Sequence, residues 1–384
     1  MRFVTFKRSE DDTERVGILK GDKLIDLSQW ISITVGTAGQ LISENIRLVE
    51  QSDHEWLSRY KQRNEIFQEL AWNSALGQRL ASSIEDTLSK YGKQISPDTF
   101  RPTALAIDLP EPFNMLALIE AELDGDLSLD LTRLLLEQEE DHLIADELLL
   151  PLSAVTLLPP IPRPPKHVLC LGRNYAEHAA ESTRAFGEVQ PVEKPAFPAI
   201  FTKAPTAITG PYSDIPYDPH VSTQIDWEGE LAVVIGKAGK NIRREDAMRH
   251  VFGYTVLNDI SARDIQKRHG GQFFKGKSLD GSCPTGPWIV TADEIPDPHN
   301  LELTVRVNGV VKQHDNTRSM LFDIPEIIEH LSLGMTLEPG DIIATGTPAG
   351  VGHARTPPEF LRPGDIVEVE IEHIGTIKNR IAEA

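Results

Sequence analysis

Residues 226–236 read DWEGELAVVIG, and this segment decides the fold more than any other part of the chain. Two glutamates, Glu228 and Glu230, stand two residues apart at the start of an apolar strand, so their side chains point to the same face. The next apolar run, VFGYTVLND at residues 251–259, ends on Asp259. The sequence therefore predicts three carboxylates at the ends of two strands.

Similar short runs, bounded by Gly, Pro and Asp, continue outward from this segment and are typical of strands. They are HVLCLG, AIFTKAPTAITG, LELTVRVNG, DIIATG and DIVEVEIEHIGTIKN. Helical patterns are few, at Asn174 to Thr183, Arg244 to His250 and Ile324 to Leu333. We expect an α+β fold with a mixed β architecture, not a doubly wound sheet. No Gly-x-Gly-x-x-Gly or Walker-type loop occurs, so a nucleotide site is not indicated.

The N-terminal part of the chain has a different pattern of apolar residues from the β-rich part. RFVTFKR and RVGILKGDKLIDLS predict two or three short strands with a turn at Gly21-Asp22, and a mostly helical, acidic segment follows from about Ser43 to Leu149. Five prolines between residues 159 and 166 cannot continue a helix or lie in a central strand. We therefore predict an N-terminal domain at residues 1–160 and a catalytic domain at residues 161–384.

The amino-acid composition argues against several classes of protein. A formal charge of −20 disfavours binding to nucleic acid or to an anionic membrane surface. No apolar run reaches the length of a membrane helix, and the N-terminus lacks the apolar core of a secretory signal. Two cysteines are too few for a disulfide framework. We expect a cytoplasmic protein that binds neither nucleic acid nor membrane.

The three carboxylates indicate a metal site. Like charges this close repel one another unless a cation lies between them, and oxygen ligands suit magnesium, manganese or calcium. Taken singly, the two glutamates also fit a solvated strand face, and Asp259 fits a turn or helix cap.

Four other segments carry candidate chemistry, each with a plainer alternative. Arg263 fits a substrate carboxylate or an ion pair with Asp264 or another local acid. Lys277, in a loop predicted at residues 276–287, fits an oxyanion donor or a surface lysine. The segment TGTPAGVG at residues 345–352 fits a ligand-contacting loop or a simple turn.

His178 and Glu181 are neighbours on one predicted helical face. A carboxylate beside an imidazole makes a competent general base, although such pairs are also common on exposed helices.

In order and wording these segments resemble the fumarylacetoacetate hydrolase family, from about Lys166 to Ile381. The resembling blocks are GRNYAEHAAE, DWEGELAVVIGKAGKNI, FGYTVLNDISARDIQ, GKSLDGSCPTGPW, RVNGVVKQHDNT, PGDIIATGTPAGVG and LRPGDIVEVEIEHIGTIKN. The resemblance implies a mixed β-sandwich roll, here with a small N-terminal β-unit and a helical insert, a homodimer, and a bound Mg²⁺ or Mn²⁺, with Ca²⁺ as a further option. The helical segment departs from the family pattern.

The resemblance also assigns roles to residues. It implies that the metal ligands are Glu228, Glu230 and Asp259, and that the catalytic residues are His178, Glu181 and Lys277. It implies that substrate is bound by Arg173, Tyr175, Arg263, Gln266 and Thr347.

The resemblance and the residue chemistry together predict a metal-dependent enzyme for a small keto-acid substrate. Our main expectation is hydrolysis of a carbon–carbon bond in an acylpyruvate or related diketo acid, through an enolate stabilised by the metal and Lys277. The same enolate also serves isomerisation or decarboxylation of a 2-keto or 2-hydroxymuconate-type diacid, which is the first alternative. A non-catalytic binding protein on the same scaffold is the second alternative.

Overall fold

The computed structural model describes residues 1–9, 12–29, 114–116, 118–119, 136, 148–185 and 194–384. The chain forms two compact units, a larger one of Met1–Glu14 with Val155–Ala384 and a smaller one of Arg15–Ala154. The division at residue 160 stays a prediction. The first strand differs from that expectation, because it pairs within the larger unit.

The smaller unit contains an antiparallel arrangement of three strands, β2 (Arg15–Lys20), β3 (Lys23–Asp26) and β4 (Leu149–Pro151). The predicted turn between β2 and β3 is confirmed, and Gly21 adopts a φ of 64° there. The helical segment predicted from Ser43 to Leu149 lies almost wholly outside the described residues.

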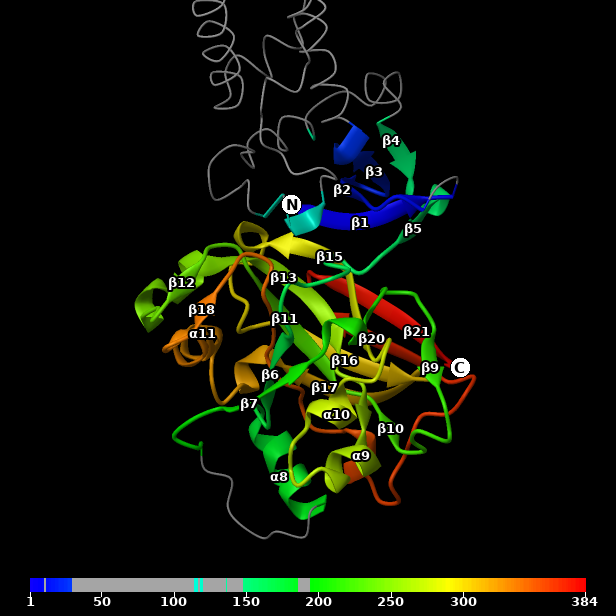
Figure 1. Ribbon diagram of the computed structural model, residues 1–384, viewed down its shortest axis with the longest axis vertical. Coiled ribbons are helices and arrows are strands. Elements are labelled where there is room, and N and C mark those ends of the chain that lie inside the picture. The colour runs from blue at the N-terminus through cyan, green and yellow to red at the C-terminus, as the bar shows by residue number, and fades with distance from the viewer. Residues whose placement is uncertain (10–11, 30–113, 117, 120–135, 137–147, 186–193) are drawn as a thin grey trace, which may run out of the picture. The chain divides into compact units, whose positions relative to one another are not determined.

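The larger unit is built on a mixed sheet with the strand order β1-β15-β13-β11-β19-β6-β7 (Figure 1). All neighbouring pairs with printed register are antiparallel except β19 with β6. Two short strands pair outside this order, β5 with β1 and β8 with β15. The bounds are β1 (Arg2–Arg8), β5 (Val155–Leu157), β6 (Val168–Gly172), β7 (Ala199–Lys203), β8 (Ile208–Thr209), β11 (Gly229–Ile235), β13 (Val251–Asn258), β15 (Cys283–Thr291) and β19 (Ile342–Ala344).

A second sheet of five strands has the order β17-β16-β20-β21-β9, and two short ladders pair β10 with β14 and β12 with β18. The bounds are β9 (Ile215–Tyr217), β10 (Ile225–Asp226), β12 (Gly239–Lys240), β14 (Ser261–Ala262), β16 (Glu302–Val307), β17 (Val310–Asn316), β18 (Thr336–Leu337), β20 (Ile366–Ile371) and β21 (Gly375–Glu383). The mixed sheets with few helices confirm the predicted α+β class.

All three helical predictions in the larger unit are confirmed, one of them as a 3₁₀ helix. The α-helices with described bounds are α8 (Ala176–Ala185), α9 (Arg263–Arg268), α10 (Phe274–Lys277) and α11 (Ile324–Ser332). The 3₁₀ helices are η2 (Leu152–Ala154), η3 (Pro205–Ala207), η4 (Arg244–His250), η5 (Ala292–Glu294), η6 (Thr317–Ser319) and η7 (Gly352–Ala354). Helix α10 packs on both α9 and β7, and α8 packs on η7.

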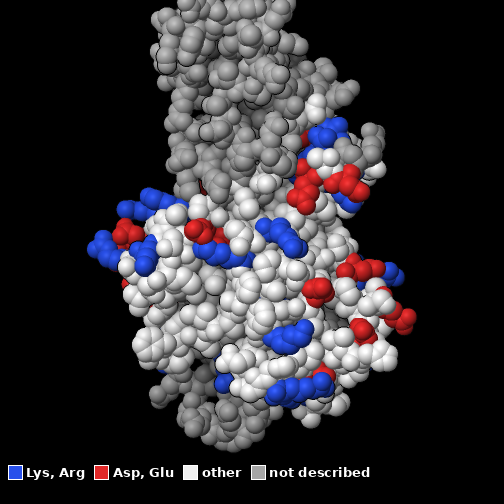
Figure 2. Space-filling view, viewed as in Figure 1, with Lys and Arg blue, Asp and Glu red and all other residues white. Residues whose placement is uncertain are grey.

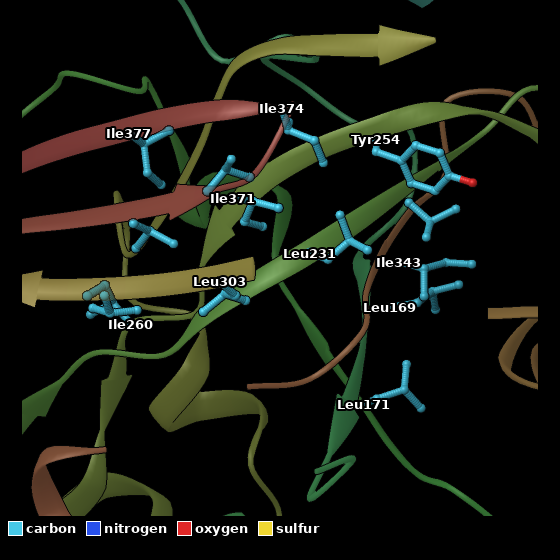
Figure 3. Close-up of a cluster of buried hydrophobic side chains, with 14 of the residues drawn as sticks. Leu169, Leu171, Leu231, Tyr254, Ile260, Leu303, Ile343, Ile371, Ile374 and Ile377 are labelled. Carbon is cyan, nitrogen blue, oxygen red and sulfur yellow. The ribbon is translucent and has the colours of Figure 1, made fainter. Parts of the chain in front are cut away.

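The core lies where the two sheets face each other. Figure 3 shows Leu231 and Tyr254 from the first sheet in one cluster with Leu303, Ile371 and Ile377 from the second. Every residue of β11 is buried, as expected for a strand covered on both faces.

The glycine between the two glutamates has a packing reason. A Cβ on Gly229 would lie 2.4 Å from Val305 Cγ2 and 2.9 Å from Val369 Cγ1. The second sheet therefore packs against β11 between Glu228 and Glu230 too closely for a side chain, and glycine fits at that point.

Two predictions of local structure were wrong. The loop predicted at residues 276–287 begins at the end of α10 and continues into β15, where Thr285 and Gly286 pair with Leu257 and Val256. The strand predicted at residues 199–210 is divided into β7, η3 and β8, because Pro205 supplies the first residue of a 3₁₀ turn.

In the described parts of the chain, no helix is long and apolar enough to cross a membrane.

Candidate active site

Glu228, Glu230 and Asp259 come together as predicted. One carboxylate oxygen from each lies within 4.8 Å of the others, and all three side chains are buried. Their backbones are tied by the Asp259 amide, which donates to the Glu228 carbonyl at 2.8 Å. The end of β13 thus holds its carboxylate beside the start of β11, so neither a solvated strand face nor a simple turn describes these residues.

Glu228 lies between two cations. Lys277 Nζ is 2.6 Å from Glu228 Oε2, and Arg263 Nη2 is 2.6 Å from Glu228 Oε1. Burial alone would raise the pKa of Glu228, but the charges of Lys277 and Arg263 outweigh it and lower that pKa. Glu228 is therefore a carboxylate at neutral pH.

Asp259 is held by two lysines, one on each oxygen. Lys277 Nζ is 2.7 Å from Oδ2 and Lys203 Nζ is 2.8 Å from Oδ1. Burial lowers the pKa of Lys277, but Asp259 and Glu228 raise it further than burial lowers it. Lys277 is thus a buried ammonium, not the surface lysine of the alternative interpretation.

Glu230 has different surroundings. Its Oε2 accepts a hydrogen bond of 2.7 Å from the Gly346 amide, and within the described residues no lysine or arginine forms an ion pair with it. Burial, followed by the negative charges of Asp259 and Glu228, raises the pKa of Glu230 well above its usual value.

This donor set fits a divalent cation. Among the described residues, this cluster holds one cation fewer than carboxyl groups, because Glu230 has no ion-pair partner there. The cations are Lys203, Arg263 and Lys277, and the carboxyl groups are Asp226, Glu228, Glu230 and Asp259. Three buried oxygen donors with residual negative charge suit Mg²⁺ or Mn²⁺, and Ca²⁺ also takes such ligands. The identity of the ion stays a prediction.

Arg263 is anchored by protein acids, although not by Asp264. Its Nε donates to Asp226 Oδ2 at 2.8 Å and its Nη1 to Gln266 Oε1 at 3.1 Å. Asp264 instead accepts from Ser222 and pairs with Arg268. The guanidinium is thereby fixed in the wall of a pocket.

His178 and Glu181 form the predicted pair on α8. His178 Nδ1 lies 2.9 Å from Glu181 Oε1, and the Gly350 amide lies 3.0 Å from both oxygens of the same carboxylate. Gly350 has a φ of 108°, and a Cβ there would lie 2.1 Å from the Lys312 carbonyl oxygen. Only glycine can therefore present this amide, and Glu181 is fixed as the orienting partner of the imidazole.

A pocket joins most of these groups. It encloses about 440 Å³ of empty space, including the part open to solvent. It is lined by Leu171, Gly172, Arg173, His178, Phe201, Glu228, Arg263, Gln266, Phe273, Lys277, Thr347 and His353. The substrate-binding predictions for Arg173, Arg263, Gln266 and Thr347 thus concern residues that share one cavity wall.

Tyr175 is the predicted substrate residue that does not line this pocket. Its side chain is fully buried, and its backbone bridges to Met320. Burial, with the nearby charge of Glu230, raises the pKa of its phenol. Its role in substrate binding stays a prediction.

Sequence reasoning missed Asp226, Lys203 and His353. Asp226 precedes the strand that was quoted first, and Lys203 ends an apolar strand, so each is a charged residue beside a buried run. That signal identifies both as candidates for buried ion pairs. Nothing in the local pattern around His353 marks it.

The face in Figure 2 shows Lys and Arg side chains interspersed with Asp and Glu on the described part of the chain. On this face the acidic side chains of the described residues therefore do not form a single-sign patch.

Comparison with known proteins identifies the family. The model described as "Fumarylacetoacetate (FAA) hydrolase C-terminal" matches residues 167–382. The chain belongs to the fumarylacetoacetate hydrolase family. Among solved structures, the fumarylacetoacetate hydrolase of Exiguobacterium antarcticum is similar over 100% of both chains, with a TM-score of 0.65 and 31% identity.

Relatives in this family carry isomerase-type names. The oxaloacetate tautomerase YisK of Bacillus subtilis is 52% identical over 230 residues, which are 60% of this chain and 74% of that protein. A mitochondrial oxaloacetate tautomerase of Bos taurus is 52% identical over 233 residues, 60% of this chain and 71% of that protein. The structure of 2-hydroxyhepta-2,4-diene-1,7-dioate isomerase from Mycobacterium marinum is 42% identical, with a TM-score of 0.51 over 61% of this chain and 81% of that chain.

These fumarylacetoacetate hydrolase family relatives support the prediction of an enzyme. They favour the first alternative, isomerisation, over carbon–carbon bond hydrolysis, which is supported at family level only.

Proposed function

We propose that this chain is a divalent-metal-dependent tautomerase that interconverts the keto and enol forms of a 2-keto diacid of the oxaloacetate type. The observation that carries the proposal is the convergence of Glu228, Lys277, Arg263 and His178 on one pocket, beside the buried carboxylates of Glu230 and Asp259. The names of the relatives supply the substrate class.

The carboxylates of Glu228, Glu230 and Asp259 would hold the cation. When bound, a divalent cation supplies a Lewis acid that polarises the keto oxygen of a 2-keto acid. This is the chemistry that an enol or enolate intermediate needs, since negative charge develops on that oxygen.

Lys277 and Arg263 provide the positive wall. The pKa of Lys277 is raised by Asp259 and Glu228 against the effect of burial, so its ammonium persists and can donate to an oxygen that gains negative charge. Arg263 presents a fixed cation to a carboxylate of the substrate. Because both are paired with carboxylates, the positive charge that draws an anionic substrate toward this strongly negative chain would come from the divalent cation.

His178 moves the proton. Because Nδ1 is engaged by Glu181, the other ring nitrogen is the one that can take up and return a proton. The rings of Phe201 and Phe273, which pack edge to face with centroids 5.5 Å apart, give the pocket an apolar side. A wall of this kind limits water, which tautomerisation does not consume and hydrolysis requires.

The test compares three reactions of the purified protein in Mg²⁺. We expect the ultraviolet absorbance of enol-oxaloacetate to decay faster than in buffer, without release of pyruvate and CO₂. If acylpyruvates were cleaved with a higher kcat/KM than the enol is converted, the proposal would be overturned in favour of the hydrolase. Pyruvate and CO₂ released at the rate of enol conversion would indicate a decarboxylase instead.

Hydrolysis of an acylpyruvate remains the second candidate, and the His178–Glu181 pair favours it. The same pair can remove a proton from water as readily as from carbon or oxygen.

We also propose that the chain forms a homodimer, on the family resemblance alone. Size-exclusion chromatography with light scattering tests this directly, because a monomer mass at micromolar concentration would contradict it.

A further inference from the structure

Strand β17 buries a glutamine and exposes two valines, which reverses the usual preference of these residue types. Gln313 is 1% exposed, whereas Val310 and Val311 are 57% and 51% exposed. In the sheet Gln313 is the partner of Val305, whose side chain is the one that approaches Gly229. A buried carboxamide needs hydrogen-bond partners, so the contacts of Gln313 explain why it is buried at this position.

The carboxamide of Gln313 binds two segments of the active site. Its Oε1 accepts from the Gly229 amide at 3.1 Å. Its Nε2 donates to Thr347 Oγ1 at 2.9 Å and to the Pro348 carbonyl at 2.7 Å, which uses both of its hydrogens. The opposite orientation of the carboxamide would place a donor against the Gly229 amide and an acceptor against the Pro348 carbonyl, so these partners fix the orientation.

These contacts close into a ring of three hydrogen bonds. The Gly229 amide donates to Gln313, Gln313 donates to the Thr347 hydroxyl, and that hydroxyl donates to the Gly229 carbonyl at 2.8 Å. A hydroxyl has a single proton, so the one on Thr347 is directed to Gly229 while its oxygen accepts from Gln313. Each of the three residues thus both donates and accepts within the ring, which holds their relative positions.

The ring lies at the junction of the predicted metal ligands and the pocket wall. Gly229 stands directly between Glu228 and Glu230, and Thr347 lines the pocket. The Gly346 amide, one residue before Thr347, donates to Glu230 Oε2 at 2.7 Å. The same two segments are therefore joined twice, once through a predicted metal ligand and once through Gln313.

We propose that Gln313 is a positioning residue for the metal site. By holding Gly229 and Thr347 in one hydrogen-bonded ring, it sets how the carboxylates of Glu228 and Glu230 are presented to a divalent cation. Gln313 does not itself line the pocket, so it acts through its two partners. The inference rests on the proposed metal-dependent function. Groups that orient metal ligands without touching the metal typically contribute about 10–100-fold to metal affinity or activity.

The test uses Gln313→Met, because methionine has a similar length and volume but makes none of these hydrogen bonds. Asn379→Leu is the matched control. Asn379 is a fully buried residue of β21 whose carboxamide donates to the Gly210 and Ser213 carbonyls at 3.0 and 2.8 Å, and it does not line the pocket. The measurements are the dissociation constant of Mg²⁺ by calorimetry without substrate, the melting temperature in a chelator, and kcat at saturating Mg²⁺.

We expect both variants to lower the melting temperature, but only Gln313→Met to weaken Mg²⁺ binding, by about tenfold or more. Saturating Mg²⁺ should restore most of kcat in Gln313→Met, since no group that contacts substrate is removed. A lowered melting temperature with unchanged Mg²⁺ affinity would show that Gln313 only stabilises the fold, as Asn379 does, and would overturn the proposal. The same holds for a low kcat at saturating Mg²⁺ with unchanged affinity.

Thr347→Val covers the case in which Gln313→Met fails to fold. It is close in shape and opens the ring from the other side, because it removes the bonds to Gln313 and to the Gly229 carbonyl. Thr347 is not a predicted metal ligand, so weaker Mg²⁺ binding without substrate supports the proposal, and unchanged binding in the folded variant contradicts it. Failure of the underlying function gives a different result, because the wild type itself would then bind no Mg²⁺.

Discussion

The two ends of the Glu-Gly-Glu segment differ more than their spacing suggests. Glu228 lies between Lys277 and Arg263 and has a lowered pKa, whereas Glu230 accepts a hydrogen bond from the Gly346 amide, forms no ion pair with the described lysines and arginines, and has a raised pKa. Both side chains are buried and belong to one stretch of chain. Burial raises the pKa of both carboxyl groups, and only at Glu228 do the charges of Lys277 and Arg263 outweigh it. The site therefore has one end balanced by protein cations and another end without an ion pair among the described residues.

Of the substitutions that test this difference between the two glutamates, Glu230→Gln should have the largest effect. It removes the oxygen donor with no protein counter-charge, so we expect Mg²⁺ affinity and kcat/KM to fall by about 10³-fold, in line with several kcal/mol for a lost metal interaction. Isothermal titration calorimetry with Mg²⁺ measures the first. If even the wild type showed no divalent-metal binding, the enzyme interpretation itself would fail and the binding-protein alternative would gain support.

Stability should separate the two glutamates in the metal-free protein. Glu228→Gln removes a counter-charge from Lys277 and Arg263, and we expect a loss of about 3 kcal/mol in the free energy of unfolding. Glu230 is protonated in the metal-free protein because its pKa is raised, so Glu230→Gln replaces one neutral group by another and should change the free energy of unfolding little. Urea denaturation in a chelator measures both, and equal losses would contradict the charge assignment.

The two lysines on Asp259 give a smaller contrast. Lys277 lines the pocket and Lys203 does not, so at saturating Mg²⁺ we expect Lys277→Met to lower kcat by about 100-fold. Lys203→Met is the matched control, because it removes an equivalent ion pair from the other oxygen. It should lower the melting temperature while retaining most of kcat. Equal losses of kcat would show that Lys277 acts only by holding Asp259.

The smallest expected effect is the change of Mg²⁺ affinity with pH that Glu230 causes. The raised pKa of Glu230 means that the metal-free protein holds a proton there which the metal must displace, so Mg²⁺ affinity should rise by up to about tenfold per pH unit until that pKa is passed. Conversely, the metal-free protein loses stability as pH rises through the same pKa. Calorimetry in buffers of different ionisation enthalpy should show proton release, and Glu230→Gln should abolish it.

Much of the fold and part of the site followed from the sequence. The strands around residues 226–259 and the meeting of Glu228, Glu230 and Asp259 were predictable, since strand periodicity fixes which side chains share a face. For Lys277 the residues left an oxyanion donor and a surface lysine open, and the family resemblance favoured the first. Its partner Glu228 lies 49 residues away in sequence, so no local pattern shows the contact.

What escaped prediction depends on contacts across longer distances. His353 meets Asp226 over 127 residues, and the Gly350 amide meets Glu181 over 169. No local pattern encodes such pairs. The extension of β15 into a stretch rich in glycine and proline is likewise set by its partner β13.

The segment from Thr347 to His353 joins several of these contacts in seven consecutive residues. It supplies a hydroxyl that donates to the Gly229 carbonyl, the amide that fixes Glu181, and an imidazole of the pocket wall. The positions of these three groups therefore depend on the number of residues in the segment. One inserted or deleted residue would misplace all three. In laboratory evolution we expect substrate range to change by substitution within this segment, and its length to stay constant.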